Sequence, residues 1–269
     1  MKKVLCFLLI LLLLASVALP AFGAEQPPED LLLTLVNPWN PLPEGWKVEP
    51  VSIGNGHRVD KTCYDDLMAM MDACRAQGLS PMVRSSYRTQ SVQEQLHENK
   101  VRQWISYGLS EEDARRKAAT IVAIPGTSEH QLGWAVDIVD KSYQTLDEWQ
   151  AETPAQIWLM AHSWEYGFIL RYPSDKSDVT GIIYEPWHYR YVGRENARII
   201  FESGLCLEEF LQTRQQQTAI RNGVKNALAQ LYQGTARRIF LLLTRPAEVF
   251  RSIVTQTAPA ISAVDVMKP

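Results

Sequence analysis

The sequence is poor in cysteine, with four in 269 residues, and one of these, Cys6, lies in the apolar N-terminal segment. The other three, Cys63, Cys74 and Cys206, are an odd number, which excludes a fold held together by a complete set of disulfides. Cys63 and Cys74 fall in one predicted helix, about 16 Å apart at a rise of about 1.5 Å per residue, which is too far to bridge. Although Cys206 could pair with either, we expect three buried free thiols.

The sequence also lacks an excess of basic residues, since 27 Lys and Arg stand against 30 Asp and Glu, for a net charge of −3. No basic footprint for nucleic acid is present, so we expect no nucleic-acid partner. The charges are unevenly distributed: residues 24–212 hold 17 basic and 28 acidic side chains, net −11, whereas residues 213–269 hold eight basic and two acidic ones, net +6. Such asymmetry is typical of a segment that meets a membrane or another polyanion.

Long apolar runs are absent except at the N-terminus, where residues 4–15 form an unbroken run of 12. Lys2 and Lys3 precede this run, and Ala21 and Gly23 supply the small residues of a cleavage site before Ala24. These features predict a secretory signal peptide over residues 1–23, with an uncleaved anchor as the alternative. In both cases we expect the rest of the chain to be exported to the cell envelope or secreted.

The pattern of apolar and polar residues predicts long helices mixed with short strands, without a repeating strand–helix unit. Residues 24–50 are rich in proline and are expected to lie over the domain as an extended lead-in. Helices are predicted at 62–77, 90–107, from 110, from 153 to a stop at Gly167, before Gly204 and over 207–211. Strands are predicted at 81–86, 133–139, 168–172 and 187–192. This order predicts an α+β domain with a central antiparallel sheet flanked by helices.

Two of the five histidines lie in motifs that suit a metal centre. His130 precedes Asp137 with Gly133 between them to permit a tight turn, and His188 follows on another predicted strand. Two imidazoles and one carboxylate are a donor set of catalytic zinc, which keeps its fourth position for water. Glu185 lies three residues before His188, where its carboxylate could take a proton from that water. A His–Asp pair at this spacing is usually structural and Glu-x-x-His is common by chance, so the spacing alone leaves both interpretations open.

The residues around these motifs make the sequence similar to a known family. The pattern Ser-x-His-x-x-Gly-x-Ala-x-Asp at 128–137, followed by Glu-x-Trp-His at 185–188, resembles the zinc D-alanyl-D-alanine carboxypeptidases of the VanY type. Ser-Tyr-Arg-Thr at 86–89 and the segment 166–173 resemble further parts of that domain, in the same order. The resemblance implies a single zinc-peptidase domain over residues 51–211, which removes the terminal D-alanine from peptidoglycan stem peptides.

The same resemblance implies a role for each motif residue. It implies that His130, Asp137 and His188 bind one Zn²⁺ per chain, that Glu185 is the general base and that Arg88 stabilises the developing oxyanion. The residues that it implies for substrate binding are Ser86, Gln93, Ser128 and Tyr172.

Several alternatives use the same motifs. An L,D-carboxypeptidase acting on tetrapeptide stems and a D,D-dipeptidase would share the metal site, so the motifs do not separate them. A zinc-stabilised wall-binding module without catalysis is a further alternative, which the presence of Glu185 and Arg88 argues against. Arg171 and Arg190 lie in predicted strands beside the site and could meet acidic groups of the stem peptide.

Residues 212–269 form a basic tail outside the resemblance. The apolar residues that share one predicted helical face there are Ile220, Val224, Leu228 and Leu231. A basic amphipathic helix is typical of interfacial membrane binding, whereas the five consecutive apolar residues at 239–243 are too few to span a bilayer. We expect residues 214–254 to bind the membrane surface or an anionic wall polymer, with a helical hairpin packed on the domain or a loose tail as the alternative.

Overall fold

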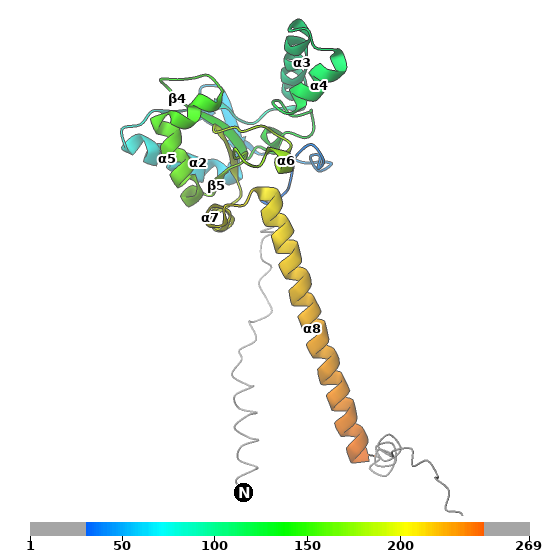
Figure 1. The fold of residues 1–269 in the computed structure, drawn as a ribbon. Helices are drawn as coiled ribbons and strands as arrows, with labels where there is room; N and C mark the ends of the chain where they lie inside the picture. The colour runs from blue at the N-terminus through cyan, green and yellow to red at the C-terminus, as the bar shows by residue number, and fades with distance from the viewer. Residues whose placement is uncertain (1–30, 245–269) are drawn as a thin grey trace, which may run out of the picture. The chain divides into compact units, whose positions relative to one another are not determined.

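The structure, a computed structural model, describes residues 31–244, and the side chains of residues 31–233. The predicted signal peptide over 1–23 and residues 245–254 of the predicted membrane-binding segment lie outside the described residues. The chain divides into two compact units, residues 1–208 and residues 209–269 (Figure 1).

Four antiparallel strands form the central sheet of the first unit. In spatial order they are β3 (Pro81–Ser85), β4 (Ala135–Asp140), β6 (His188–Tyr191) and β5 (Phe168–Leu170). All six residues of β4 are buried, as befits an interior strand that is covered on both faces. The predicted α+β class with an antiparallel sheet is confirmed, although β5 and β6 end earlier than the sequence pattern suggests.

Helix α2 (Lys61–Ala76) supplies much of the core of this unit. It begins where predicted because the Asp60 carboxylate accepts the Thr62 N–H at 2.9 Å, which is the usual way to cap the first turn. Cys63 and Cys74 are free thiols on its buried face, as expected, and Cys206 is buried as well. Burial raises the pKa of Cys63 to about 12, so this thiol stays protonated.

The remaining helices of the first unit flank the sheet. Helix α5 (Pro154–His162) contacts β4, and helix α7 (Arg194–Ser203) contacts β5. Thr153 caps α5 through the Gln156 N–H, with proline in the first turn as the sequence predicts. The short elements are the α-helix α6 (Ser177–Thr180) and the 3₁₀ helices η1 (Glu129–Leu132), η2 (Glu148–Glu152) and η3 (Ser163–Tyr166).

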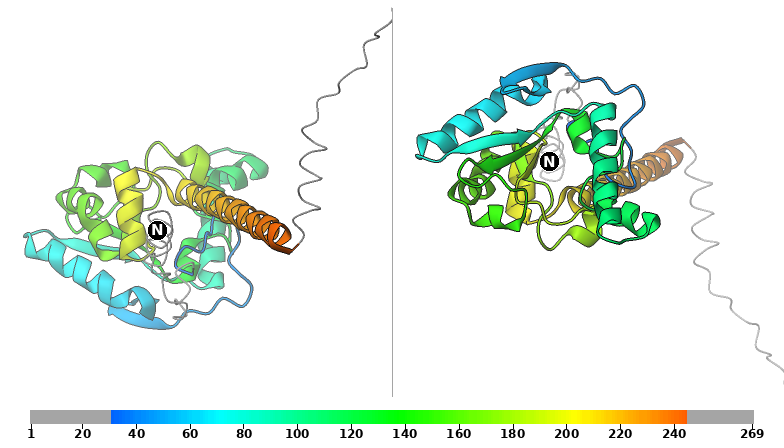
Figure 2. Two further views of the ribbon diagram at one scale, coloured as in Figure 1. Left: turned by 90° about the horizontal axis from the view of Figure 1, so that it is seen from below. Right: turned by 90° about the horizontal axis from the view of Figure 1, so that it is seen from above.

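Helices α3 (Gln90–Ser106) and α4 (Glu111–Ala119) form a pair set to one side of the sheet (Figures 1 and 2). Val101, Ala114 and Ala118 bury a small apolar cluster between them, separate from the main core. The Ser110 hydroxyl accepts the Asp113 N–H at 3.1 Å and starts α4 as predicted.

One hairpin was not predicted, and it is formed by β1 (Pro50–Gly54) and β2 (His57–Asp60). Its turn is Asn55-Gly56, in which φ is 52° at Asn55 and 79° at Gly56. An Asn-Gly pair between short strands is a strong hairpin signal because both residues tolerate positive φ. That signal was present in the sequence, so this hairpin was predictable.

Residues 31–49 lie against the domain. Leu33 and Val36 are buried, and the Trp46 ring meets the Trp134 ring edge-on with their centroids 4.9 Å apart. The Trp46 indole N–H donates to the Leu132 carbonyl at 3.2 Å, next to the turn that carries His130. This segment therefore supports the loop that forms the site.

Helix α8 (Leu207–Thr244) begins where predicted but runs far beyond Leu211, so the predicted end is wrong. No proline interrupts residues 212–244, and Gln, Arg, Ala and Leu are good helix formers. The glycines at 223 and 234 are tolerated within the helix, although each weakens it. Among the described residues, no helix combines the length and the hydrophobicity needed to cross a membrane.

Candidate metal centre and active site

Strand pairing brings the first two candidate ligands together. Asp137 of β4 is directly opposite His188 of β6, and it is also paired with Ser85 of β3 on the other side. The distance from His188 Nδ1 to Asp137 Oδ1 is 3.1 Å. Two residues far apart in the sequence thus face each other because of the register of the sheet.

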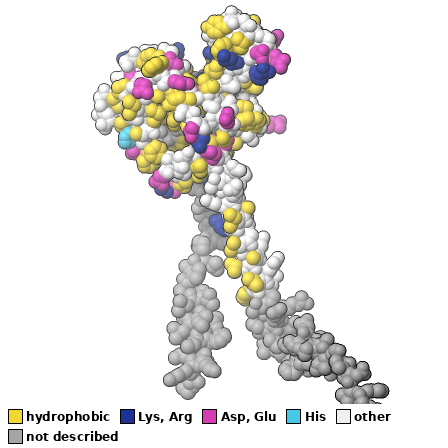
Figure 3. All heavy atoms as spheres, viewed as in Figure 1, with side chains coloured by type: hydrophobic (Ala, Val, Ile, Leu, Met, Phe, Trp, Pro, Cys, Tyr) yellow, Lys and Arg dark blue, Asp and Glu magenta, His cyan; other side chains and the backbone are white. Residues whose placement is uncertain are grey.

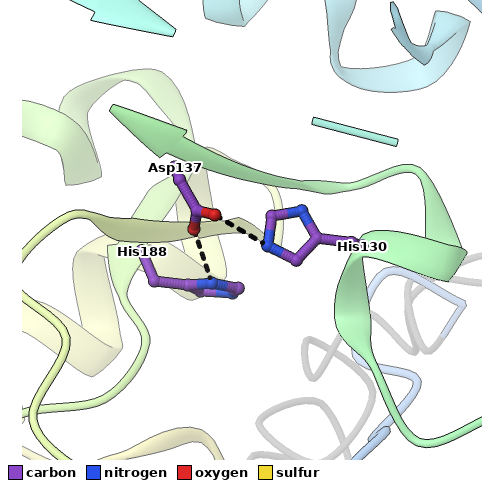
Figure 4. A group of neighbouring side chains, drawn as sticks. All are labelled: His130, Asp137 and His188. Atoms are coloured by element: carbon purple, nitrogen blue, oxygen red, sulfur yellow. Dashed lines mark hydrogen bonds and ion pairs between the residues drawn. The ribbon is translucent and has the colours of Figure 1, made fainter. Parts of the chain in front are cut away.

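The third candidate ligand, His130, lies in η1 just before β4 (Figure 4). Its Nε2 is 3.2 Å from Asp137 Oδ2, and its Nδ1 is 2.9 Å from the Ser86 carbonyl oxygen. Since a carbonyl can only accept, Nδ1 carries the proton and Nε2 keeps its lone pair. This hydrogen bond is of the kind that orients metal-binding histidines.

Gly133 ends η1 and is required there for two reasons. Its φ is +83°, a conformation that side chains rarely adopt. A Cβ at this position would also lie 2.7 Å from Val48 Cγ1 and 3.0 Å from the Asp60 Cβ. Only glycine lets the chain turn between His130 and β4 at this close approach.

The three side chains fit a zinc ion by the chemistry of their donors. One ligand atom from each of His130, Asp137 and His188 lies within 4.8 Å of the others, and all three residues are buried. Burial and the charge of Arg88 lower the pKa of His130 to about 4, so this imidazole is neutral. Burial opposes the charged form of His188, but Asp137 and Glu129 outweigh it and raise the pKa of His188 to about 9, so a metal would have to displace a proton from His188. Two imidazoles and a carboxylate in a buried cluster match the donor set of catalytic zinc.

Glu185 is held close to His188 by a short turn. The His188 N–H donates to the Glu185 carbonyl at 3.1 Å, and the Glu185 N–H donates to the Tyr172 carbonyl at 3.2 Å. The distance from Glu185 Oε2 to His188 Nδ1 is 3.7 Å. Burial raises the pKa of Glu185 to about 8, far above that of an exposed carboxyl.

Arg88 is fixed on the other side of the cluster. Its guanidinium donates to Asp137 Oδ2 at 2.9 Å, to the Ser85 hydroxyl at 2.9 Å and to the Gln93 amide oxygen at 3.3 Å. Its backbone N–H donates to the His130 carbonyl at 3.1 Å. The cation is therefore held rigidly beside the candidate metal ligands.

These groups open into one cleft of about 210 Å³. Its wall contains the polar residues Arg88, Ser128, Glu129, His130, Asp137, Tyr172, Glu185 and His188. Trp187 and a set of aliphatic side chains complete the wall, and Lys100 of α3 also contributes. The structure thus gathers all the predicted metal ligands, both predicted catalytic residues and two of the four predicted substrate-binding residues in one place.

The other two predicted substrate-binding residues lie outside the cleft wall. Gln93 is fully buried, accepts from Arg88 and donates to the Ala123 carbonyl at 2.8 Å. The Ser86 hydroxyl accepts the Arg58 N–H at 3.2 Å, and the Ser86 carbonyl orients His130. Both residues support groups that line the cleft.

A buried ion cluster, which the sequence pattern did not predict, lies next to the candidate metal ligand His188. Glu129 Oε1 accepts from Arg171 Nε at 2.7 Å and from the Arg190 guanidinium at 2.8 Å, and Arg171 also binds Glu208 through two hydrogen bonds. Glu129 Oε2 lies 3.4 Å from His188 Nε2. Burial opposes the charge of Glu129, but the two arginines outweigh it and keep its pKa below the usual range.

This cluster corrects the expectation for Arg171 and Arg190. Both side chains are fully buried, so neither can meet an acidic group of a stem peptide. Their partner Glu129 is 42 residues from Arg171 and 61 residues from Arg190, so no local sequence pattern predicts these ion pairs. The clue in the sequence was only the position of Glu129 directly before His130.

A candidate three-ligand cluster, a buried carboxyl and a fixed cation share one cleft, which is an arrangement that suits a hydrolase. The profile of the VanY D-alanyl-D-alanine carboxypeptidase family matches residues 56–194. A D-alanyl-D-alanine carboxypeptidase of Enterococcus faecalis is 43% identical over 204 residues, which are 71% of this chain and 74% of that relative. The chain belongs to the VanY family of D-alanyl-D-alanine carboxypeptidases, which confirms the resemblance seen in its motifs.

Solved structures agree with this assignment. A mutant of the vancomycin-resistance D,D-pentapeptidase VanY in complex with Zn(II) is 44% identical, with a TM-score of 0.62, and covers 66% of this chain and 98% of its own. VanYB in complex with D-alanine-D-alanine is also 44% identical, with a TM-score of 0.63 and coverage of 68% and 98%.

Proposed function

We propose that the protein is a zinc-dependent carboxypeptidase that removes the C-terminal D-alanine from peptidoglycan stem peptides outside the cytoplasm. The observation that carries this proposal is the His130–Asp137–His188 cluster, which shares one cleft with Glu185 and Arg88. Membership of the VanY family and the D-alanine-D-alanine complex of VanYB support the choice of substrate. The signal-peptide pattern of residues 1–23 supports export.

A zinc ion in the cluster supplies Lewis-acid chemistry, because it lowers the pKa of a water molecule and polarises the scissile carbonyl. His130 offers Nε2, since its Nδ1 donates to the Ser86 carbonyl. His188 offers Nδ1, which faces Asp137, while its Nε2 faces Glu129. Asp137 brings the negative charge that a divalent cation requires.

Glu185 is the proton carrier of the proposed reaction. A divalent cation held by the neighbouring ligands would favour the ionised form of Glu185. That carboxylate takes a proton from the attacking water and later gives the proton to the amine of the departing D-alanine. Its place between the metal ligand His188 and the open cleft suits both steps. The turn that joins Glu185 to His188 keeps the carboxyl and the ligand at a constant separation.

Arg88 stabilises the negative charge that develops on the carbonyl oxygen. A guanidinium carries five N–H donors, and three of these are used by Ser85, Gln93 and Asp137 in the described part of the chain. Arg88 lines the cleft, where a fixed cation stabilises an oxyanion without reorganisation. Gln93 acts through Arg88 by holding its guanidinium in place.

Ser128 and Tyr172 bind the terminal D-residue in this proposal. Both are buried residues of the cleft wall, and the Tyr172 ring centroid lies 4.8 Å from that of His188. The two hydroxyls would together orient the terminal carboxylate.

Defined stem peptides test the proposal. The purified protein, supplied with zinc, is incubated separately with tri-, tetra- and pentapeptide stems and with free D-alanyl-D-alanine, and the products are identified by mass. We expect release of one D-alanine from the pentapeptide only. Cleavage of the tetrapeptide would instead identify an L,D-carboxypeptidase, cleavage of the free dipeptide a D,D-dipeptidase, and no product at all a wall-binding module.

A further inference from the structure

Helix α8 displays an exposed apolar stripe within the second unit. The stripe consists of Ile220, Val224, Leu228 and Leu231, whose exposed fractions are 66%, 55%, 61% and 67%. At about 100° per residue, these four side chains fall within an arc of roughly 80° on the helix. Figure 3 shows the corresponding run of hydrophobic side chains along α8.

Cationic side chains border one edge of this stripe. By the same geometry, Arg214, Arg221 and Lys225 fall within the next roughly 60° of the helix surface. The opposite face carries uncharged polar residues, among them Asn222, Asn226 and Gln230. Over residues 214–232 the helix thus has an apolar stripe, a cationic flank and a neutral polar back.

The charge of this segment has one sign. Residues 210–244 contain five Arg and Lys and no Asp or Glu. This is unlike the acidic body of the chain, in which basic side chains are outnumbered. A partner for the stripe must therefore be apolar where it meets the stripe and anionic where it meets the flank.

We propose that the apolar stripe and cationic flank of α8 dock on an anionic lipid bilayer, with the helix lying in the plane of the interface. A bilayer offers acyl chains for the four apolar side chains and headgroup phosphates for the cations at the same depth. Arg and Lys beside an apolar stripe suit this position because their stems lie along apolar surface while their charges reach the headgroups. This surface function goes beyond the proposed peptidase activity.

Two other occupants fit the helix less well. A second copy of α8 would bring the flank cations of the two chains together without acidic residues to pair with them, whereas paired helices normally carry charges of both signs beside the seam. An anionic wall polymer would match the flank but would leave the apolar stripe in water.

Vesicle binding of full-length variants tests the proposal. All variants keep the same apolar N-terminal segment, so a difference in binding between them comes from α8. The stripe variant carries Ile220→Gln, Leu228→Gln and Leu231→Gln, the flank variant carries Arg221→Gln and Lys225→Gln, and the matched control carries Asn222→Gln and Asn226→Gln on the polar back. Glutamine is a good helix former, and circular dichroism checks that helicity is retained. Each protein is sedimented with vesicles of phosphatidylcholine alone or with a third of phosphatidylglycerol.

We expect the parent protein to bind the anionic vesicles, and the stripe variant to lose at least tenfold in its partition coefficient. The flank variant should lose about 30-fold on anionic vesicles and little on neutral ones, since each of the two cations contributes about 1 kcal/mol at an anionic surface. The control should stay within twofold of the parent. Equal binding by the parent and the stripe variant, or equal binding to both kinds of vesicle, would overturn the proposal.

Two further measurements separate the other occupants. The first is sedimentation velocity without vesicles. If the parent forms a dimer, the stripe variant does not, and the parent does not bind vesicles, then the partner of the stripe is a second copy of the chain and not a bilayer. The second is binding to purified wall polymer. If that binding requires the flank cations but not the stripe, and the parent does not bind vesicles, then the partner is the polymer and not a bilayer. Release of D-alanine from a soluble stem should be equal in all variants, so failure of this proposal leaves the peptidase assignment untouched.

Discussion

The two units of the chain use charge in opposite ways. In the first unit the charges near the site are buried and paired: Glu129 lies between Arg171 and Arg190, and Asp137 pairs with Arg88. In α8 beyond Glu209 the sequence supplies cations without acids, beside an exposed apolar stripe. Paired buried charges fix the positions of catalytic groups, whereas charges of one sign on an open face are suited to an external partner. Changes in the first unit should therefore alter chemistry or stability, and changes on the exposed stripe and cationic flank of α8 should alter neither.

Removal of the metal should give the largest effect on the first unit. We expect dialysis against a strong chelator to abolish release of D-alanine from a pentapeptide stem, and added zinc to restore it, because the proposed reaction needs the Lewis acid that His130, Asp137 and His188 would hold. Turnover is followed by mass, and bound zinc by atomic absorption. Full activity in protein shown to be free of metal would contradict the proposed mechanism.

Glu185→Gln should come next. The amide keeps the shape of the carboxyl but cannot carry the proton, so we expect kcat to fall by about 10²–10⁴-fold, the usual contribution of general acid–base catalysis. Zinc content should equal that of the parent. The matched control is Glu44→Gln, which changes an exposed carboxylate away from the cleft and should leave kcat unchanged.

Glu129→Gln should affect stability more than any other single change in the buried ion cluster. It leaves Arg171 and Arg190 without their shared counter-charge, and breaking a buried pair in this way lowers the free energy of unfolding by about 3–5 kcal/mol. Urea unfolding followed by fluorescence measures the change. The exposed pair of Glu112 and Arg116 provides the comparison, since Glu112→Gln should leave the urea midpoint nearly unchanged.

Gly133→Ala tests the turn that carries His130. The new methyl group would combine positive φ with contacts of 2.7 Å to Val48 and 3.0 Å to Asp60, so we expect a loss of about 1–3 kcal/mol and weaker zinc binding. Gly204→Ala is a matched control, because its φ of +66° is strained as well but nothing lies within 4 Å of the added Cβ. If both variants bound zinc equally well, crowding at η1 would not be what positions His130.

The smallest effect is expected in α8. Ile220→Gln with Leu228→Gln should leave the urea midpoint of the first unit and the turnover of a soluble stem peptide within experimental error, because both side chains are exposed on the second unit. A marked loss of turnover on soluble peptide would show that the exposed stripe of α8 contributes to peptidase activity, which is assigned to the first unit alone.

The course of the helices and strands was largely predictable, but their ends and pairings were less so. Caps and breakers such as Asp60, Ser110 and Thr153-Pro154 act within a few residues, so the sequence shows where α2, α4 and α5 begin. For α8 the sequence pattern predicted two helical segments, 207–211 and the face that carries Ile220 to Leu231, but no cap or breaker showed that they form one helix. Of the missed features, the β1–β2 hairpin had a local signal in Asn55-Gly56, whereas the pairing of Glu129 with two distant arginines had none.

The sequence by itself determined the chemistry: which residue types are present, in motifs specific enough to indicate the family, and which end of the chain is basic. Tertiary structure alone decided which of these residues meet. The register of β4 and β6 sets Asp137 against His188, and a turn that only glycine can make brings His130 to them. The tertiary structure also distinguishes arginines that look alike in the sequence. Arg171 and Arg190 are buried in an ion cluster, whereas Arg88 lies on the cleft wall. The physical reason is that burial and pairing depend on contacts between residues tens of positions apart, which no local pattern encodes.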